Sequence, residues 1–235
     1  ILPGANGSAQ VYESREARPV VYLIPGHGSD YRIFGEWDLK GFDTRHIELP
    51  TPEKRESMTE YSHRLADQID TNREFILVGI SFGGMNAVEI AEYLDPLEVI
   101  IISSAKCRSE LPLRYRFMKA LPLYGIIPAR LYIPLGHFAR AVFEPDYKRD
   151  EEVFRAMLNA KDPQFVKRAI RLTVRWQRSE CSDRVIHIHG TRDHTLPYRN
   201  IAEPIAIEDG SHMMALTEAE AVSGIINEIL DQYRN

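Results

Sequence analysis

Runs of consecutive apolar residues recur along the chain and predict strands that are buried on both faces. The clearest are segments 20–24 and 75–79, VVYLI and FILVG, and glycine-containing turns follow both. Strands buried on both faces are typical of parallel sheets. Further strands are expected at segments of similar character: 44–49, 97–102, 184–189 and 205–207.

Between these runs, apolar residues spaced three or four positions apart predict amphipathic helices. The segments with this spacing are 56–70, 82–94 and 215–232. Strands that alternate with helices predict the α/β class, with a mostly parallel central sheet that helices cover on both faces.

The 106–180 segment interrupts this alternation. It has no clear strand pattern, and prolines separate its short helical stretches. We expect a mostly helical insertion here, lying over one edge of a core formed by residues 1–105 and 181–235. The apolar side chains of 111–138 are expected to pack on the core, with some lining a substrate pocket. The basic residues of 167–178 are expected to face solvent.

Composition narrows the class of protein. The 235 residues are 44% hydrophobic and 27% charged, with a net charge of −5. Such a chain folds, and without a basic excess it is no dedicated nucleic-acid-binding protein. No apolar run approaches the roughly 18 residues of a membrane span.

The first residues bear on location. Residues 1–10 have neither the basic nor the apolar region of a secretory signal peptide, which favours a cytoplasmic location. Because the chain does not begin with Met, a signal peptide that has been removed is the alternative. The glycosylation sequon at 6–8 is a three-residue pattern that most often arises by chance.

A nucleophile motif lies between a predicted strand and a predicted helix. Gly79-Ile80-Ser81-Phe82-Gly83 has the pattern G-x-S-x-G. The glycines are needed because the turn is tight and a Cβ there would clash with neighbouring backbone. The turn would present the Ser81 hydroxyl at the carboxyl edge of the sheet. Ser81 is therefore the candidate nucleophile, and a glycine-rich turn without a catalytic role is the alternative.

A serine hydroxyl needs a base within hydrogen-bond reach. His212 follows the last predicted strand, at the same edge of the sheet as Ser81, and is favoured over His27 as that base. Asp193 ends the preceding strand and is the candidate that orients His212, with Asp209 as the spare. The order Ser81, Asp193, His212 is the one that accompanies G-x-S-x-G turns.

A serine that attacks a carbonyl carbon also needs backbone N–H donors for the developing oxyanion. The amide of Phe82, at the start of the helix, is one candidate. The amide of His27 is the other, because glycines on both sides of it let the backbone approach a substrate. An ordinary loop is the alternative for residues 25–28.

These motifs resemble those of the α/β-hydrolase-fold serine hydrolases, of the small lidded esterase and lipase-like type. The resemblance rests on the residues at 79–84, 189–193, 210–212 and 25–28, and it extends over nearly all of residues 18–232. It implies the α/β-hydrolase fold and places the family's variable lid at 106–180. One departure is that Pro25-Gly26 replaces the family's usual His-Gly pair, in the oxyanion loop.

The predicted activity is hydrolysis of a small to medium, mostly apolar carboxylic ester through an acyl-enzyme. Serine rather than aspartate at position 81 argues against haloalkane and epoxide substrates. No cofactor and no metal are expected, and the expected partner is the small-molecule ester. Thioesters, lactones, amides and carbon–carbon bonds next to a ketone stay open as substrates, and so does the oligomeric state.

Two other functions compete with this one. His187 and His189 alternate on one predicted strand, and Asp193 and His194 follow, which resembles the metal motif of metallo-β-lactamase-like hydrolases. Three residues separate His189 from Asp193, however, where that motif has one. The second alternative is a hydrolase-fold receptor with little turnover, because a fold does not determine a function.

The two cysteines, Cys107 and Cys181, lie at the two ends of the predicted lid. A disulfide at its base is geometrically conceivable. Disulfides are rare in the cytosol, however, and free cysteines are commonly buried as small apolar residues. We therefore expect two free thiols with no catalytic role.

Overall fold

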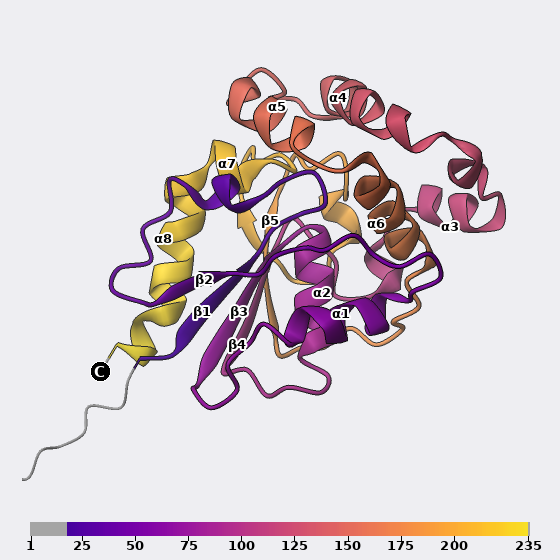
Figure 1. Ribbon diagram of the computed structural model, residues 1–235. Coiled ribbons are helices and arrows are strands. Elements are labelled where there is room, and N and C mark those ends of the chain that lie inside the picture. Colours follow the sequence, from indigo (N-terminus) through magenta and orange to yellow (C-terminus); the bar gives the residue numbers. More distant parts are fainter. Residues whose placement is uncertain (1–17, 235) are drawn as a thin grey trace, which may run out of the picture.

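The computed structural model describes residues 18–234, in which a parallel sheet lies between two layers of helices (Figure 1). The segments of 1–10 discussed above, with the sequon at 6–8, lie outside the described residues. The sheet has the strand order β2-β1-β3-β4-β5-β6. In chain order the strands are β1 (Val20–Ile24), β2 (Thr44–His46), β3 (Phe75–Ile80), β4 (Glu98–Ile102), β5 (Val185–Gly190) and β6 (Ile205–Ile207).

The most apolar strands occupy the middle of the sheet. Every residue of β1 and β3 is buried, as expected for strands that are covered on both faces. The edge strand β2 is exposed throughout, and it ends at His46, three residues short of its predicted end. The register places Ile24 opposite Gly79 and Ile80 opposite Ile102, so the strands end at a common carboxyl edge.

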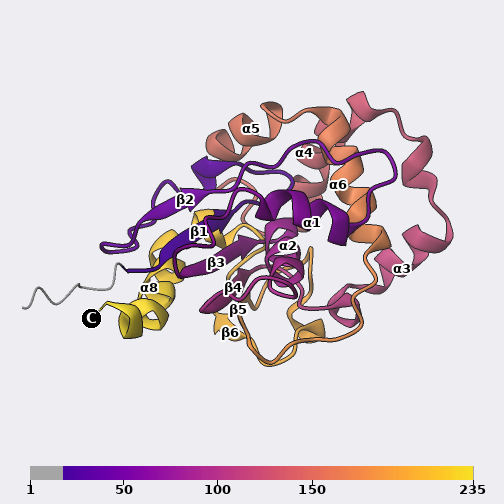
Figure 2. The same cartoon turned by 60° about the horizontal axis from the view of Figure 1, so that its bottom comes forward.

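Helices cover both faces of the sheet. Seen from below, α1 (Met58–Ala66) and α2 (Phe82–Ile90) lie on one side and α8 (Ala219–Leu230) on the other (Figure 2). A capping box begins α1, because Ser57 and Glu60 each accept a hydrogen bond from the other's backbone N–H. The helix predicted at 215–232 is two helices, α7 (Met214–Thr217) and α8.

The 106–180 segment contains four α-helices and lies above the carboxyl edge of the sheet in Figure 1. Its helices are α3 (Leu113–Ala120), α4 (Tyr132–Phe143), α5 (Glu151–Asn159) and α6 (Pro163–Arg175). The apolar stripe of α6 joins the core beside α1 and α2. In contrast, α3 has no buried residue, so the expectation that the apolar residues of 111–138 pack on the core is wrong for many of them.

The basic residues of α6 also differ from expectation. Lys167 donates to the carbonyl oxygens of Gly125 and Ile127, at 2.8 and 2.7 Å. Arg168 and Arg171 donate to backbone carbonyls of the loop that precedes α1. These three side chains therefore join α6 to neighbouring loops instead of only facing solvent.

Cys107 and Cys181 form a disulfide, with their Cα atoms 4.9 Å apart, so the prediction of free thiols is wrong. The two ends of the 106–180 segment run side by side here, because the N–H of Arg108 donates to the carbonyl of Arg178 at 2.8 Å. Disulfides are typical of oxidising compartments, which does not favour the predicted cytoplasmic location. Within residues 18–234, none of the helices combines the length and apolar character that crossing a membrane requires.

Candidate active site

Ser81 occupies the sharp turn between β3 and α2. Its φ of 51° and ψ of −115° are unusual for a residue with a side chain, and such strain is typical of functional turns. A Cβ on Gly79 would lie 2.5 Å from the Gly83 carbonyl oxygen, and one on Gly83 would lie 2.5 Å from the Pro25 carbonyl oxygen. Only glycine fits at these two positions, because backbone atoms cannot give way.

The structure brings Ser81, His212 and Asp193 into one hydrogen-bonded chain. Ser81 Oγ lies 3.0 Å from His212 Nε2, and His212 Nδ1 lies 2.8 Å from Asp193 Oδ2. The carboxylate can only accept, so Nδ1 carries the proton and Nε2 presents a lone pair to the Ser81 hydroxyl. This is the tautomer that a general base for Ser81 requires.

The contact between Asp193 and His212 keeps the Asp193 carboxylate ionised. Burial of Asp193 disfavours its charged form, but the His212 charge and the hydrogen bond to it outweigh burial and hold the Asp193 pKa below its usual value. Burial also opposes charge on His212, yet Asp193 raises the His212 pKa above 6.5. Asp193 therefore stabilises the imidazolium that forms when His212 takes a proton.

The loops that carry Asp193 and His212 are fixed against one another. The second carboxylate oxygen of Asp193 accepts the N–H of Leu196 at 2.7 Å. A Cβ on Gly190 would collide with the backbone of Gly210, so the two loops meet through their main chains. Asp209, the spare acid, is turned outward, and its carboxylate lies 3.8 Å from Arg192.

Glu144 is a buried carboxylate beside His212 that the sequence analysis missed. Its Oε2 accepts the backbone N–H of His212 at 3.0 Å, and its Oε1 accepts the Thr195 hydroxyl at 2.5 Å. Burial raises the Glu144 pKa, against the lowering influence of His212. Glu144 follows α4, far from any recognised motif, so no local signal marks it.

A cavity of about 390 Å³ opens beside Ser81 and His212. Its walls come from residues 26–29 and from helices α3 to α6. Several apolar residues that the sequence analysis placed in the lid line this cavity: Met118, Tyr124, Ile127, Tyr132 and Leu135. The space next to the Ser81 hydroxyl is therefore largely apolar.

The two predicted oxyanion donors border the same space. Phe82 begins α2, so its N–H has no partner within the helix. His27 lines the cavity, and within residues 18–234 its backbone N–H makes no hydrogen bond. Burial, with smaller contributions from His212 and Lys161, lowers the pKa of the His27 imidazole to about 4. The imidazole of His27 is therefore neutral at pH 7.

His187 and His189 are buried in β5 and face each other. His189 Nε2 donates to the Leu196 carbonyl at 2.8 Å, and its Nδ1 lies 3.1 Å from His187 Nε2. Burial lowers the pKa of both imidazoles. In the part of the chain that the structure describes, His, Cys, Asp and Glu form no group of three that could hold a metal ion.

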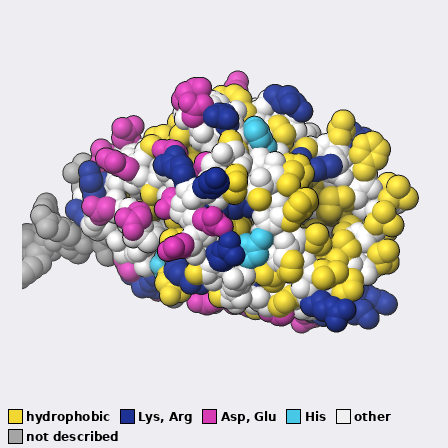
Figure 3. Space-filling model, turned by 90° about the horizontal axis from the view of Figure 1, so that it is seen from above, with side chains coloured by type: hydrophobic (Ala, Val, Ile, Leu, Met, Phe, Trp, Pro, Cys, Tyr) yellow, Lys and Arg dark blue, Asp and Glu magenta, His cyan; other side chains and the backbone are white. Residues whose placement is uncertain are grey.

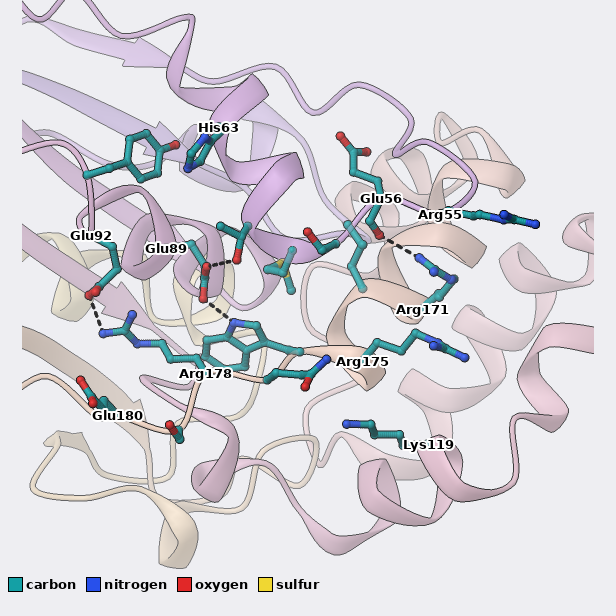
Figure 4. A pocket seen from close by; sticks show the side chains of 18 residues that line it. Arg55, Glu56, His63, Glu89, Glu92, Lys119, Arg171, Arg175, Arg178 and Glu180 are labelled. Carbon is teal, nitrogen blue, oxygen red and sulfur yellow. Dashed lines mark hydrogen bonds and ion pairs between the residues drawn. The ribbon is translucent and has the colours of Figure 1, made fainter.

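A larger cavity, of about 700 Å³, lies between α1, α2 and the end of α6 (Figure 4). Charged side chains line it, and most of its carboxylates already form hydrogen bonds or ion pairs with neighbouring side chains. Glu89 accepts from the Trp176 indole at 2.7 Å, and Glu92 pairs with Arg178 at 2.6 Å. Neither Ser81 nor His212 lines it.

Solved structures share this fold at low sequence identity. A thermophilic esterase from Thermogutta terrifontis is 18% identical with a TM-score of 0.68, and the match covers 92% of this chain and 91% of that one. MenH from S. aureus is 16% identical with a TM-score of 0.69, covering 94% and 97%. An enol-lactonase from Burkholderia xenovorans LB400 is 14% identical with a TM-score of 0.67, covering 91% of both.

Comparison with curated protein sequences gives no match. Residues 1–225 match the Alpha/beta hydrolase family, which is nearly the whole chain. The parallel sheet, the helices on its two faces and the strained turn after β3 agree with this assignment. The fold class and the family resemblance predicted from the sequence are confirmed, and the chain belongs to the alpha/beta hydrolase family.

Proposed function

We propose that this hydrolase cleaves a small to medium, mostly apolar carboxylic ester with Ser81 as nucleophile. The observation that carries the proposal is the hydrogen-bonded chain from Ser81 through His212 to Asp193, of which Ser81 and His212 line an apolar cavity. His212 acts as the base, and Asp193 orients it and stabilises its charged form.

The chemistry follows from these contacts. His212 Nε2 takes the Ser81 proton while Oγ bonds to the ester carbonyl carbon, and the carbonyl electron pair moves to its oxygen. When that pair returns, the bond to the alkoxide breaks, and His212 donates its proton to the leaving oxygen. Water then attacks the acyl-enzyme in the same way, releasing the acid and restoring Ser81.

The negative oxygen formed in each step needs donors placed in advance. The N–H of Phe82 lies next to the nucleophile at the start of α2, and His27 borders the same cavity. We assign these two amides to the oxyanion. Because the His27 imidazole is neutral, this residue would contribute its backbone N–H to the oxyanion but no positive charge.

The cavity supports an apolar acyl group as substrate. Its volume of about 390 Å³ is at the lower end of small-molecule sites, and aromatic and aliphatic side chains form most of its wall. Among the similar structures, one is named an esterase and another an enol-lactonase. Those names agree with an ester or lactone as the substrate class.

We also propose that 106–180 acts as a lid on a core of 1–105 and 181–235. Helices α3 to α6 supply one side of the cavity, while the strand ends supply the other. The disulfide joins the two ends of this segment. The disulfide would therefore hold the two ends of the lid together, while its helices would be able to move relative to the core.

The test is covalent labelling by a fluorophosphonate, combined with turnover of a short-chain aryl ester. Wild-type protein should be labelled and active. Ser81→Ala should lose the label and several orders of magnitude of turnover while keeping its fold. Ser29→Ala is the matched control for the label, because Ser29 also lines this cavity, and this variant should still be labelled at Ser81.

Labelling that persists in Ser81→Ala would refute the nucleophile. A wild-type protein that binds apolar esters without turning them over would instead support the hydrolase-fold receptor.

A further inference from the structure

Exposed apolar side chains are concentrated on one end of the molecule. Figure 3 shows them gathered over the end that α3, the following turns and α4 form. We call this the 113–143 surface, and its most exposed members are Leu113 (63%), Phe117 (68%), Leu121 (66%), Leu123 (65%), Ile126 (79%) and Phe138 (65%). A contiguous apolar surface of this kind marks an interaction site.

The charge of this surface has a single sign. Residues 111–143 contain no Asp or Glu, although the whole chain carries a net charge of −5. Arg116, Lys119 and Arg130 are exposed, and within residues 18–234 none of them forms an ion pair. Lys119 also borders the larger charged cavity (Figure 4). The other two cations point inward, because Arg114 and Arg140 donate to backbone carbonyls. Exposed apolar side chains beside these cations favour a partner that is both apolar and negatively charged.

A second copy of the chain fits this surface poorly. A two-fold interface would place this surface against itself, so cations and no carboxylates would face Arg116, Lys119 and Arg130. Like charges that face one another destabilise an interface. An anionic lipid surface has the complementary character, because its acyl region accepts apolar side chains and its headgroups pair with cations.

The same helices that carry this surface also line the cavity beside Ser81. Tyr115 and Met118 of α3 line it, while Phe117 of the same helix is exposed. Leu135 of α4 lines the cavity, and Phe138, one turn further, points outward. One side of each helix therefore faces the cavity and the other faces the surroundings.

We propose that the 113–143 surface binds an anionic lipid interface, with its apolar side chains in the acyl region and its three exposed cations among the headgroups. The proposal does not depend on the hydrolase activity, because binding to lipid is measured without turnover. It places α3 and α4, two helices that line the cavity, at the lipid surface.

The experiment is vesicle flotation of the full chain, with phosphatidylcholine vesicles and with phosphatidylcholine–phosphatidylglycerol vesicles. The protein should float with the anionic vesicles and be released by high salt. Arg116→Gln/Lys119→Gln/Arg130→Gln should weaken this binding by about two orders of magnitude, at about fivefold per cation. A matched triple variant of exposed cations elsewhere, Lys54→Gln/Arg184→Gln/Arg199→Gln, should float like wild type.

The apolar contribution is tested separately. Phe117→Ser/Ile126→Ser should abolish flotation, whereas Tyr31→Ser, an equally exposed aromatic outside the surface, should not. None of these residues lines the cavity beside Ser81, so turnover of a water-soluble aryl ester should be unchanged and should show that each variant is folded.

Three results would overturn the proposal. Wild-type protein could fail to float with anionic vesicles, or it could float equally with both vesicle types. Sedimentation without lipid could also show a dimer that Phe117→Ser/Ile126→Ser dissociates, which would make the surface an interface between copies of this chain.

Discussion

Replacing Asp193 with Asn should change the direction of one hydrogen bond in the candidate active site. The two oxygens of Asp193 accept from different donors, the Leu196 N–H at 2.7 Å and His212 Nδ1 at 2.8 Å. An Asn amide has only one oxygen, and the Leu196 backbone N–H can only donate. The oxygen therefore stays on Leu196, and the NH₂ group faces Nδ1.

The consequence is the wrong tautomer of His212. With an N–H facing it, Nδ1 becomes an acceptor, and the proton moves to Nε2, 3.0 Å from Ser81 Oγ. Nε2 can then no longer take the Ser81 proton. The same change in a serine protease triad lowers kcat about 10⁴-fold, or about 5.5 kcal/mol in the barrier. We expect a loss of this size, with little change in KM.

The assay is kcat and KM for a short-chain aryl ester, measured on Asp193→Asn and on Asp209→Asn. Asp209 is the matched control, because its carboxylate lies outside the hydrogen-bonded chain. Thermal unfolding of both variants shows whether the fold is kept. The reasoning is refuted if Asp193→Asn keeps more than about a tenth of wild-type kcat, or if Asp209→Asn is the inactive variant.

Three further predictions follow from other contacts. Asp193 raises the pKa of His212, and only the neutral imidazole is a base, so kcat/KM should rise with pH through a midpoint above 6.5 in a pH–rate profile. Glu144 also raises the pKa of His212, so Glu144→Gln should move the midpoint to lower pH. The weakened hydrogen bond to the His212 N–H should lower kcat/KM about tenfold. An unmoved midpoint would contradict a role of Glu144 at His212. Cys107→Ser/Cys181→Ser should lower the free energy of unfolding by about 4 kcal/mol in denaturant titrations, because the disulfide spans 74 residues. Wild-type protein with its disulfide reduced should be as unstable as this variant.

The sheet could be predicted from the sequence because its strands are continuous apolar runs. In such a run the side chains on both faces of the strand are apolar, so both faces must be covered. Every residue of β1 and β3 is buried in the structure. Ends were harder to predict. The helix expected at 215–232 breaks at Glu218, where Arg149, a distant residue, donates to the Thr217 carbonyl and pairs with Glu218. No local pattern contains that contact.

The part of the candidate site that follows parallel strands could be predicted from the order of the strands along the chain. Residues that follow parallel strands meet at one edge of the sheet, which is why Ser81, Asp193 and His212 could be grouped before their distances were known. Glu144 comes from a helix end instead. Its place beside His212 depends on how the 106–180 segment crosses the sheet, and helical periodicity does not contain that information.

The apolar residues of 111–138 show the same limit. Spacing identifies a helix and its apolar side, but it does not say whether that side meets the core, a cavity or solvent. Met118 lines the cavity, while Phe117 is exposed. The state of Cys107 and Cys181 was predicted wrongly for a related reason, since it depends on two chain ends that meet only in the folded protein.

The neighbouring strands β4 and β5 have a consequence for how the chain folds. They pair from Val99–Val185 to Ile102–Ile188, although a long stretch of chain separates them in the sequence. Strand pairing between such distant residues has a high contact order and is slow. The bridge from Cys107 to Cys181 bypasses 74 residues of that stretch. In the oxidised chain the ends of β4 and β5 are already neighbours, so most of the loop-closure entropy has been lost before folding starts. The oxidised chain should therefore complete its sheet sooner than the reduced one, and the contact between Ser81 and His212, 131 positions apart, should form only with that completed sheet.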